Sequence, residues 1–304
     1  MNGEAVWNDE SPTKFQKRIL EELLADSRRV FEWEETVPEV TWADFFRCRG
    51  IDYKGEEIMT AQSMVWENVA PALPKEVGGV QLENVVEHGC LHYVKNFETY
   101  LLPEEDQVYT KPPRVLVPPE GWERFCRGLL ELGIFDKVHE DDLYKVHGKP
   151  ILNGLFGVSK GEYENQFEVM RIIMNLVPIN QVCRSLEGDV ATLPTWAGMT
   201  PLCLMPSENL IVSSEDVRCF FYIFKIPRQW QRFMAFNRPL PQSLRGDRPG
   251  NWYPCSAVLP MGFKNSVALA QHIHRFVIRQ TLPRVPQGSE AELRKDKGFT
   301  TANP

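Results

Sequence analysis

Several features that would restrict the class of this protein are missing from its sequence. The first residues lack the basic stretch and apolar core of a secretory signal. The longest uncharged run, Val190 to Ser207, contains Pro194, Pro201 and many polar residues, so it does not predict a membrane span. No Cys-x-x-Cys pair occurs among the seven scattered cysteines, which indicates free thiols in a reducing compartment. We therefore expect an intracellular protein, cytoplasmic or nuclear, that does not associate with a membrane.

The amino-acid composition is typical of a globular protein. A chain of 304 residues with 43% apolar and 25% charged residues is long enough for two domains. The net charge of −7 is unevenly distributed, because residues 1–110 hold 10 Lys or Arg and 22 Asp or Glu, whereas residues 111–304 hold 24 and 19. A basic surface attracts polyanions, but this small excess favours nucleic-acid binding only weakly.

The first 110 residues are predicted to be acidic and mostly helical. Ser11-Pro12 is typical of an N-cap followed by proline at the first helical position, and apolar residues then recur at helical spacing to about Val30. The charged, proline-rich stretch Leu102–Pro113 predicts a linker after this region. Further helices are predicted over Trp42–Arg47, Ala61–Val69 and Leu82–Leu102.

Two histidines in this region, His88 and His92, are four residues apart and would share a helix face, as zinc ligands do. No fourth ligand is apparent, and Gly89 weakens the helix. We therefore prefer surface histidines beside a buried cysteine, Cys90, as the interpretation.

The second region is predicted to mix helices and strands. A helix begins within Pro118–Trp122 and ends at Gly133. A later helix begins at Ser266, carries one apolar face and ends at Pro283. Strands are predicted over Leu143–Gly148 and Ile151–Lys160, joined at a glycine turn, and over Phe167–Asn180 with a turn at the end.

The stretch Asp216–Tyr222 places a carboxylate at the end of a polar run, before residues that are mostly aromatic or β-branched. This pattern predicts a buried strand turning into a short helix. Asp216 then has two interpretations, both of which stay open here. It is a helix cap or turn residue, or it is a metal-binding carboxylate held on rigid backbone.

Three blocks, in order, resemble a reverse transcriptase of the retroviral or retrotransposon type over about residues 115–280. Leu259-Pro-Met-Gly-Phe-Lys-Asn-Ser266 resembles the Leu-Pro-x-Gly-φ-Lys-Asn-Ser block of that family, where φ is an apolar residue. Arg171-Ile-Ile-Met-Asn, followed by Asn180, is similar to a strand of its fingers. Asp216, with Phe221 five residues later and then Ala235-Phe236, resembles its first catalytic block.

The resemblance implies an α+β fold in three parts. Residues 1–110 form a mostly helical leader, residues 111–212 the polymerase fingers, and residues 213–304 an incomplete palm. It also implies strand extension assisted by two Mg²⁺ ions. Asp216 would be the catalytic metal ligand, and the backbone carbonyl of Val217 a further ligand, because Mg²⁺ prefers hard oxygen atoms.

The resemblance also implies a set of nucleotide contacts. Phe221 would lie beneath the incoming sugar and exclude a 2′-hydroxyl by its bulk, with a plain core aromatic as the alternative. Gly262 would let the backbone approach the nucleotide closely, and Met261 stands where the family often has a glutamine that reads it. Contacts to phosphate would come from three cations, for each of which a solvated surface charge stays open: Lys160 and Arg171 with the triphosphate, and Lys264 with nucleic acid.

The sequence departs from the family at several positions. Asn175 replaces an acidic residue and Phe220 an alanine, and no Tyr-x-Asp-Asp motif follows Ser266. The acids after Ser266 are Glu290, Glu292 and Asp296, none adjacent to another. We therefore expect a fragment, truncated before this motif and inactive alone, of a polyprotein with the remaining palm, a thumb and RNase H. Its partners would be an RNA or DNA template–primer and a deoxynucleoside triphosphate (dNTP). The alternative is a non-catalytic remnant that binds nucleic acid.

Overall fold

A computed structural model describes residues 21, 60–186, 193 and 216–281. All of these except residue 21 belong to one compact unit, Met59–Pro304. The helices predicted before residue 48, the end of the last helix at Pro283 and the tail after it lie outside the described residues. Among the residues described, no helix is both long and apolar enough to cross a membrane.

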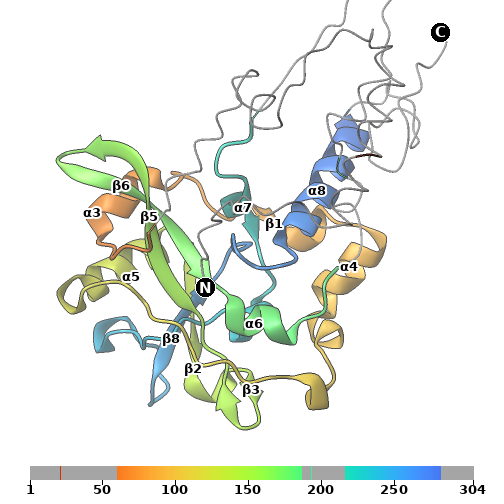
Figure 1. Cartoon of the computed structure of the whole chain (residues 1–304), viewed down its shortest axis with the longest axis horizontal. Coiled ribbons are helices and arrows are strands. Elements are labelled where there is room, and N and C mark those ends of the chain that lie inside the picture. Colours follow the sequence, from red (N-terminus) through yellow and green to blue (C-terminus); the bar gives the residue numbers. More distant parts are fainter. Residues whose placement is uncertain (1–20, 22–59, 187–192, 194–215, 282–304) are drawn as a thin grey trace, which may run out of the picture. The chain divides into compact units, whose positions relative to one another are not determined.

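The longest element is a hairpin of two antiparallel strands, β5 (Gly154–Glu164) and β6 (Phe167–Asn175) (Figure 1). Asn165 and Gln166 join the strands with φ of 48° and 71°. Positive φ at both turn residues is the requirement of a two-residue type I′ turn, whose twist matches that of the strands. The base of the hairpin is buried and its tip is exposed. Strands were predicted in both places, and both are confirmed.

Four further strands form two more pairs. β2 (Phe135–His139) pairs antiparallel with β8 (Trp252–Ser256), and β1 (Val80–Gln81) pairs in parallel with β7 (Phe224–Lys225). The chain beyond β8 continues along β7, because Ile226 N–H donates to the Ala257 carbonyl and Leu259 N–H to the Phe224 carbonyl. A mixed α+β architecture with small two-stranded sheets is therefore confirmed.

Short elements complete the fold. The predicted glycine turn occurs at His147-Gly148, between the two-residue strands β3 (Lys145–Val146) and β4 (Lys149–Pro150). The α-helices are α3 (Trp66–Val69), α4 (His88–Lys95), α5 (Trp122–Glu131), α6 (Val177–Val182), α7 (Phe220–Ile223) and α8 (Ser266–Thr281). The 3-10 helices are η1 (Ala70–Ala72), η2 (Leu82–Asn84), η3 (Phe97–Tyr100), η4 (Glu104–Asp106), η5 (Pro119–Gly121), η6 (Glu140–Asp142), η9 (Arg228–Phe233) and η10 (Gln242–Leu244).

The helix predictions hold where local signals are strong. α5 follows Pro118-Pro119, and Gly133 lies beyond its end with φ of +76°, as expected for a residue in the left-handed region at a helix C-terminus. α8 begins at Ser266 as predicted, and Leu269 and Ile273 on its apolar face are fully buried.

Four predictions are wrong where tertiary contacts or backbone restrictions outweigh local pattern. Residues 61–65 are not helical, because Gln62 exchanges backbone hydrogen bonds with Gly157 and Met64 N–H donates to the Leu116 carbonyl. The helix predicted over Leu82–Leu102 is broken into η2, α4 and η3, and His88 has a φ of 47°. The predicted turn at the end of the Phe167–Asn180 strand is α6, with proline in its first turn.

The fourth error concerns the stretch around Asp216. Asp216 and Val217 are exposed and belong to no strand, and a turn at Arg218-Cys219 leads directly into α7. Cys219 has a φ of 56°, a left-handed conformation that interrupts an extended strand. The described part of this stretch is therefore a turn followed by a helix, without the predicted buried strand.

One hydrophobic core joins the early and late parts of the unit. Tyr93 and Phe97 from the first 110 residues pack edge-on or tilted against Trp230, with ring centroids 5.5 and 4.6 Å apart. Phe263 lies 6.0 Å from Phe97 by the same measure. Residues 60–110 that the structure describes are thus an integral part of this core. The boundaries drawn at residues 110 and 212 stay predictions.

Candidate nucleotide-binding site

The loop Leu259–Ser266 depends on a glycine at its centre. Gly262 has a φ of +105°, and a Cβ atom added there would lie 2.6 Å from the Met174 carbonyl oxygen at the end of β6. Both the left-handed backbone and the close approach exclude larger residues. The loop and β6 therefore approach each other closely at the backbone. The nearby residue Met261 is 44% exposed.

An asparagine on α6 bridges the two blocks. The Asn180 Nδ2 atom donates to the Gly262 carbonyl at 2.8 Å, and its Oδ1 atom accepts the Lys264 N–H at 2.9 Å. One amide side chain thus satisfies a backbone carbonyl and a backbone N–H of the loop, as the backbone of a neighbouring strand would. Asn180 is thus bonded to the backbone on both sides of Phe263.

Lys264 is fixed in the same place by a second contact. Its Nζ atom donates to the Cys183 carbonyl at 2.7 Å, although the residue is exposed overall. The Lys264 charge lowers the pKa of the Cys183 thiol, but burial is the larger effect and raises it to about 12. One of the three ammonium donors is therefore used within the protein, and two are left for a phosphate oxygen.

The segment Asp216–Ile223 leads into β7, which pairs with the start of the loop. Asp216 is exposed, and Val217 is 50% exposed. Phe221, on α7, is half-buried against the core, where it meets Phe220 edge-on. The chain then enters β7, whose Phe224 carbonyl accepts the Leu259 N–H two residues before Met261. Backbone pairing therefore connects β7, which follows this segment, to the start of the glycine loop.

Lys160 and Arg171 lie on the β5–β6 hairpin. Arg171 is exposed on β6 opposite Val158. The Lys160 Nζ atom lies 3.8 Å from the Glu162 carboxylate, so its charge is partly compensated. Arg171 is therefore accessible to an anion, whereas the Lys160 side chain is only 20% exposed. Within the described residues, no hydrogen bond or ion pair joins Lys160, Arg171 or Asp216 to the loop around Gly262.

The metal donors are incomplete in the described part of the chain. No group of three His, Cys, Asp or Glu side chains that could hold a metal ion occurs among these residues. Asp216 is exposed, and its carboxylate oxygens fit one part of a Mg²⁺ coordination shell. His88 is exposed, and the His92 Nδ1 atom lies 3.1 Å from the Tyr100 hydroxyl group.

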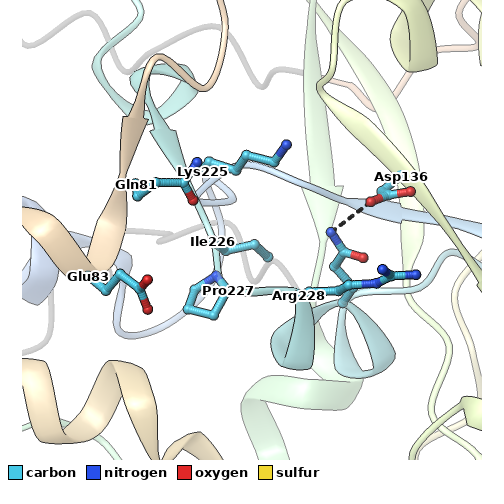
Figure 2. A pocket seen from close by; sticks show the side chains of 8 residues that line it. Gln81, Glu83, Asp136, Lys225, Ile226, Pro227 and Arg228 are labelled. Carbon is cyan, nitrogen blue, oxygen red and sulfur yellow. Dashed lines mark hydrogen bonds between the residues drawn. The ribbon is translucent and has the colours of Figure 1, made fainter.

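A separate cavity of about 440 Å³ contains none of the predicted site residues. In Figure 2 a dashed line ends at Asp136, whose Oδ2 atom accepts the Gln231 amide N–H at 3.0 Å. Cations and carboxylates both line the cavity, so its charge selects no one class of ligand. Its lining comes from β1, η2, β2, β7, η9 and the turn before η9: Gln81, Glu83, Asp136, Lys225, Ile226, Pro227, Arg228 and Gln231.

Three residues that shape the site were not predicted as site residues. Asn180 and Asn265 stand inside the blocks that carry the resemblance, so the blocks themselves were the signal. Tyr93, described further below, had no local signal, because only tertiary packing brings it near the loop.

No protein-family model matches the chain, and no curated protein matches it significantly.

Proposed function

We propose that this chain carries the fingers and part of the palm of a reverse transcriptase of the retroviral or retrotransposon type. The complete enzyme would copy an RNA or DNA template into DNA by nucleotidyl transfer assisted by two metal ions. The observation that carries the proposal is the Asn180 bridge to Gly262 and Lys264. Two motifs more than 80 residues apart in the sequence form one hydrogen-bonded unit, as two halves of one binding site would.

The loop suits contact with the base pair formed by the template base and the incoming nucleotide. Gly262 has no side chain, so a flat ligand approaches the backbone closely. Met261 presents a flexible apolar side chain beside it, which adapts to different bases. Phe221 is the residue whose bulk would select deoxyribose, and Arg171 and Lys160 supply charge for the triphosphate.

Asp216 supplies this chain's own contribution to metal binding. Its carboxylate, with the Val217 carbonyl, would hold Mg²⁺ from one side. When bound, the two ions would stabilise the entering and leaving oxygens of the transfer. The other carboxylates of the family motif are not among the described residues, so we assign no catalytic step to this chain, and we expect no primer extension by the full chain alone.

A ternary-complex measurement tests the proposal without requiring catalysis. The full chain is titrated onto a fluorescent template–primer with a dideoxy-terminated primer, in Mg²⁺ and at two salt concentrations. We expect the complementary dNTP to tighten binding about tenfold and a mismatched dNTP to have no effect. Asp216→Asn should remove most of this gain. Asp247→Asn, another exposed aspartate, in the loop before β8, serves as the matched control.

Two outcomes contradict the assignment. Salt-dependent binding that no dNTP alters would favour the non-catalytic nucleic-acid-binding remnant, since phosphate contacts alone produce that behaviour. Mg²⁺-dependent extension of a normal primer that survives Asp216→Ala would locate the activity elsewhere.

A further inference from the structure

Helix α4 is attached at both ends to elements far along the chain. The last carbonyls of a helix have no partner within it. The Val94 carbonyl accepts the Trp230 indole N–H at 2.9 Å, and the Lys95 carbonyl accepts the Gln229 amide at 2.7 Å. At the other end, the Glu87 N–H donates to the His272 Nε2 atom on α8 at 3.3 Å. α4 and α8 therefore lie side by side (Figure 1).

These attachments place one α4 side chain inside the core. Tyr93 is fully buried, and its ring packs edge-on against Phe97, Tyr100 and Trp230. Burial raises the pKa of its hydroxyl group, so the group stays neutral. The hydroxyl oxygen accepts a hydrogen bond from the Asn265 Nδ2 atom at 3.0 Å.

Asn265 then connects Tyr93 to the chain after α6. The Asn265 side chain is buried; Nδ2 also donates to the Arg184 carbonyl at 2.9 Å, and Oδ1 accepts the Leu186 N–H at 2.9 Å. Both amide hydrogens and the amide oxygen are thus used, so the side chain has one favourable orientation. On the opposite side, Arg184 N–H donates to the Tyr100 carbonyl at 2.8 Å. Residues 184–186 are held between η3 and Asn265.

We propose that Tyr93 and Asn265 are positioning residues for the loop Met261–Lys264, so that α4 is a working part of the nucleotide site. Asn265 follows Lys264 directly, and fixing its side chain fixes the backbone that places Lys264 N–H against Asn180. The effect of this positioning on nucleotide binding rests on the proposed function. The positioning itself does not, because it concerns only this chain's own hydrogen bonds.

The test compares two tyrosine-to-phenylalanine variants of the full chain by hydrogen–deuterium exchange. Tyr93→Phe keeps the buried ring and removes only the oxygen that accepts from Asn265. Tyr144→Phe removes a hydroxyl group that donates to Gln107 at 2.8 Å, and is the matched control. We expect the Leu186 and Lys264 amides to exchange about fivefold to tenfold faster in Tyr93→Phe and unchanged in Tyr144→Phe, since one hydrogen bond is lost.

The second readout is nucleotide binding in the ternary complex. Tyr93→Phe should weaken the effect of the complementary dNTP severalfold, and the control Tyr144→Phe should leave that effect unchanged. Unchanged exchange at Leu186 and Lys264, or equal acceleration at every amide of the unit, would overturn the positioning role. If the unmodified chain ignores dNTPs, the proposed function fails, but the exchange result still decides the role of Tyr93 and Asn265.

Discussion

The loop Met261–Asn265 and the segment Asp216–Cys219 both carry residues of the proposed site, but they are held differently. The loop is bonded to α6 through Asn180 and to α4 through Tyr93. In the segment, Asp216 makes no hydrogen bond or ion pair to another described residue, and Val217 is half exposed.

This difference separates two tasks. Side-chain hydrogen bonds that fix the orientation of Asn180 and Asn265 order the loop before any ligand binds. Binding therefore does not have to include the free-energy cost of ordering the loop. An exposed carboxylate is instead free to meet a cation, because nothing in the described residues competes for its oxygens. We infer that the nucleotide-reading half of the site is preformed and that the metal half is completed by ligands.

The largest expected contrast between the two regions is thiol reactivity. Cys183 is buried beside Lys264 and its pKa is about 12, so about one molecule in ten thousand carries its thiolate at pH 8. Cys219, in the turn of the segment, is half-buried. Iodoacetamide should therefore label Cys219 much faster than the buried Cys183, as followed by peptide mass spectrometry.

The pH dependence of the buried thiol has a defined sign. The folded-state pKa of Cys183 lies above its ordinary value of 9.0. Its contribution to stability is therefore complete below pH 9 and is lost as pH rises toward about 12. For the labelling experiment, the control is the urea-unfolded chain, in which Cys183 and Cys219 should react alike. Similar labelling rates for Cys183 and Cys219 in the folded chain would contradict the expected contrast.

Replacing the central glycine should disrupt the loop. Gly262→Ala forces a Cβ atom against the Met174 carbonyl and a strained backbone, so we expect a loss of about 3 kcal/mol in the free energy of unfolding. Gly161→Ala also has a positive φ, but it has open space around it, and should cost about 1 kcal/mol. Urea denaturation measures both; equal losses would show that the close approach to Met174 is not restrictive.

Removing the bridging amide should cost less. Asn180→Ala deletes two hydrogen bonds to the loop backbone, and we expect a loss of about 2 kcal/mol. Asn175→Ala removes one local contact at 3.3 Å and should cost about 0.5 kcal/mol. The two variants differ in whether they break a contact between motifs. A smaller effect for Asn180 than for Asn175 would contradict a preformed loop.

The smallest effect on stability is expected at Asp216. Asp216→Asn should leave the urea midpoint within the range of a surface substitution, about 0.5 kcal/mol in the free energy of unfolding. A destabilisation of about 2 kcal/mol or more would mean that this carboxylate has a structural partner, and would return it to the helix-cap or turn interpretation.

Sequence reasoning succeeded where a signal is local. Gly133 after α5 and the apolar, β-branched residues of β6 specify their elements through nearby residues alone. It failed where a distant partner decides. Gln62 leaves the predicted helix because Gly157 offers backbone hydrogen bonds, and the site role of Tyr93 depends on Asn265, 172 residues away. Residue types in the blocks indicated a site, but the bonds that hold it could be found only in three dimensions.

The most direct test of the proposed preformed nucleotide loop is amide exchange at Met261–Lys264, measured with and without bound template–primer. We predict slow exchange at Lys264 in the free chain and further protection of the loop by the dNTP complementary to the next template base. A loop that exchanges freely without ligand, or one protected equally by every dNTP, would contradict the account.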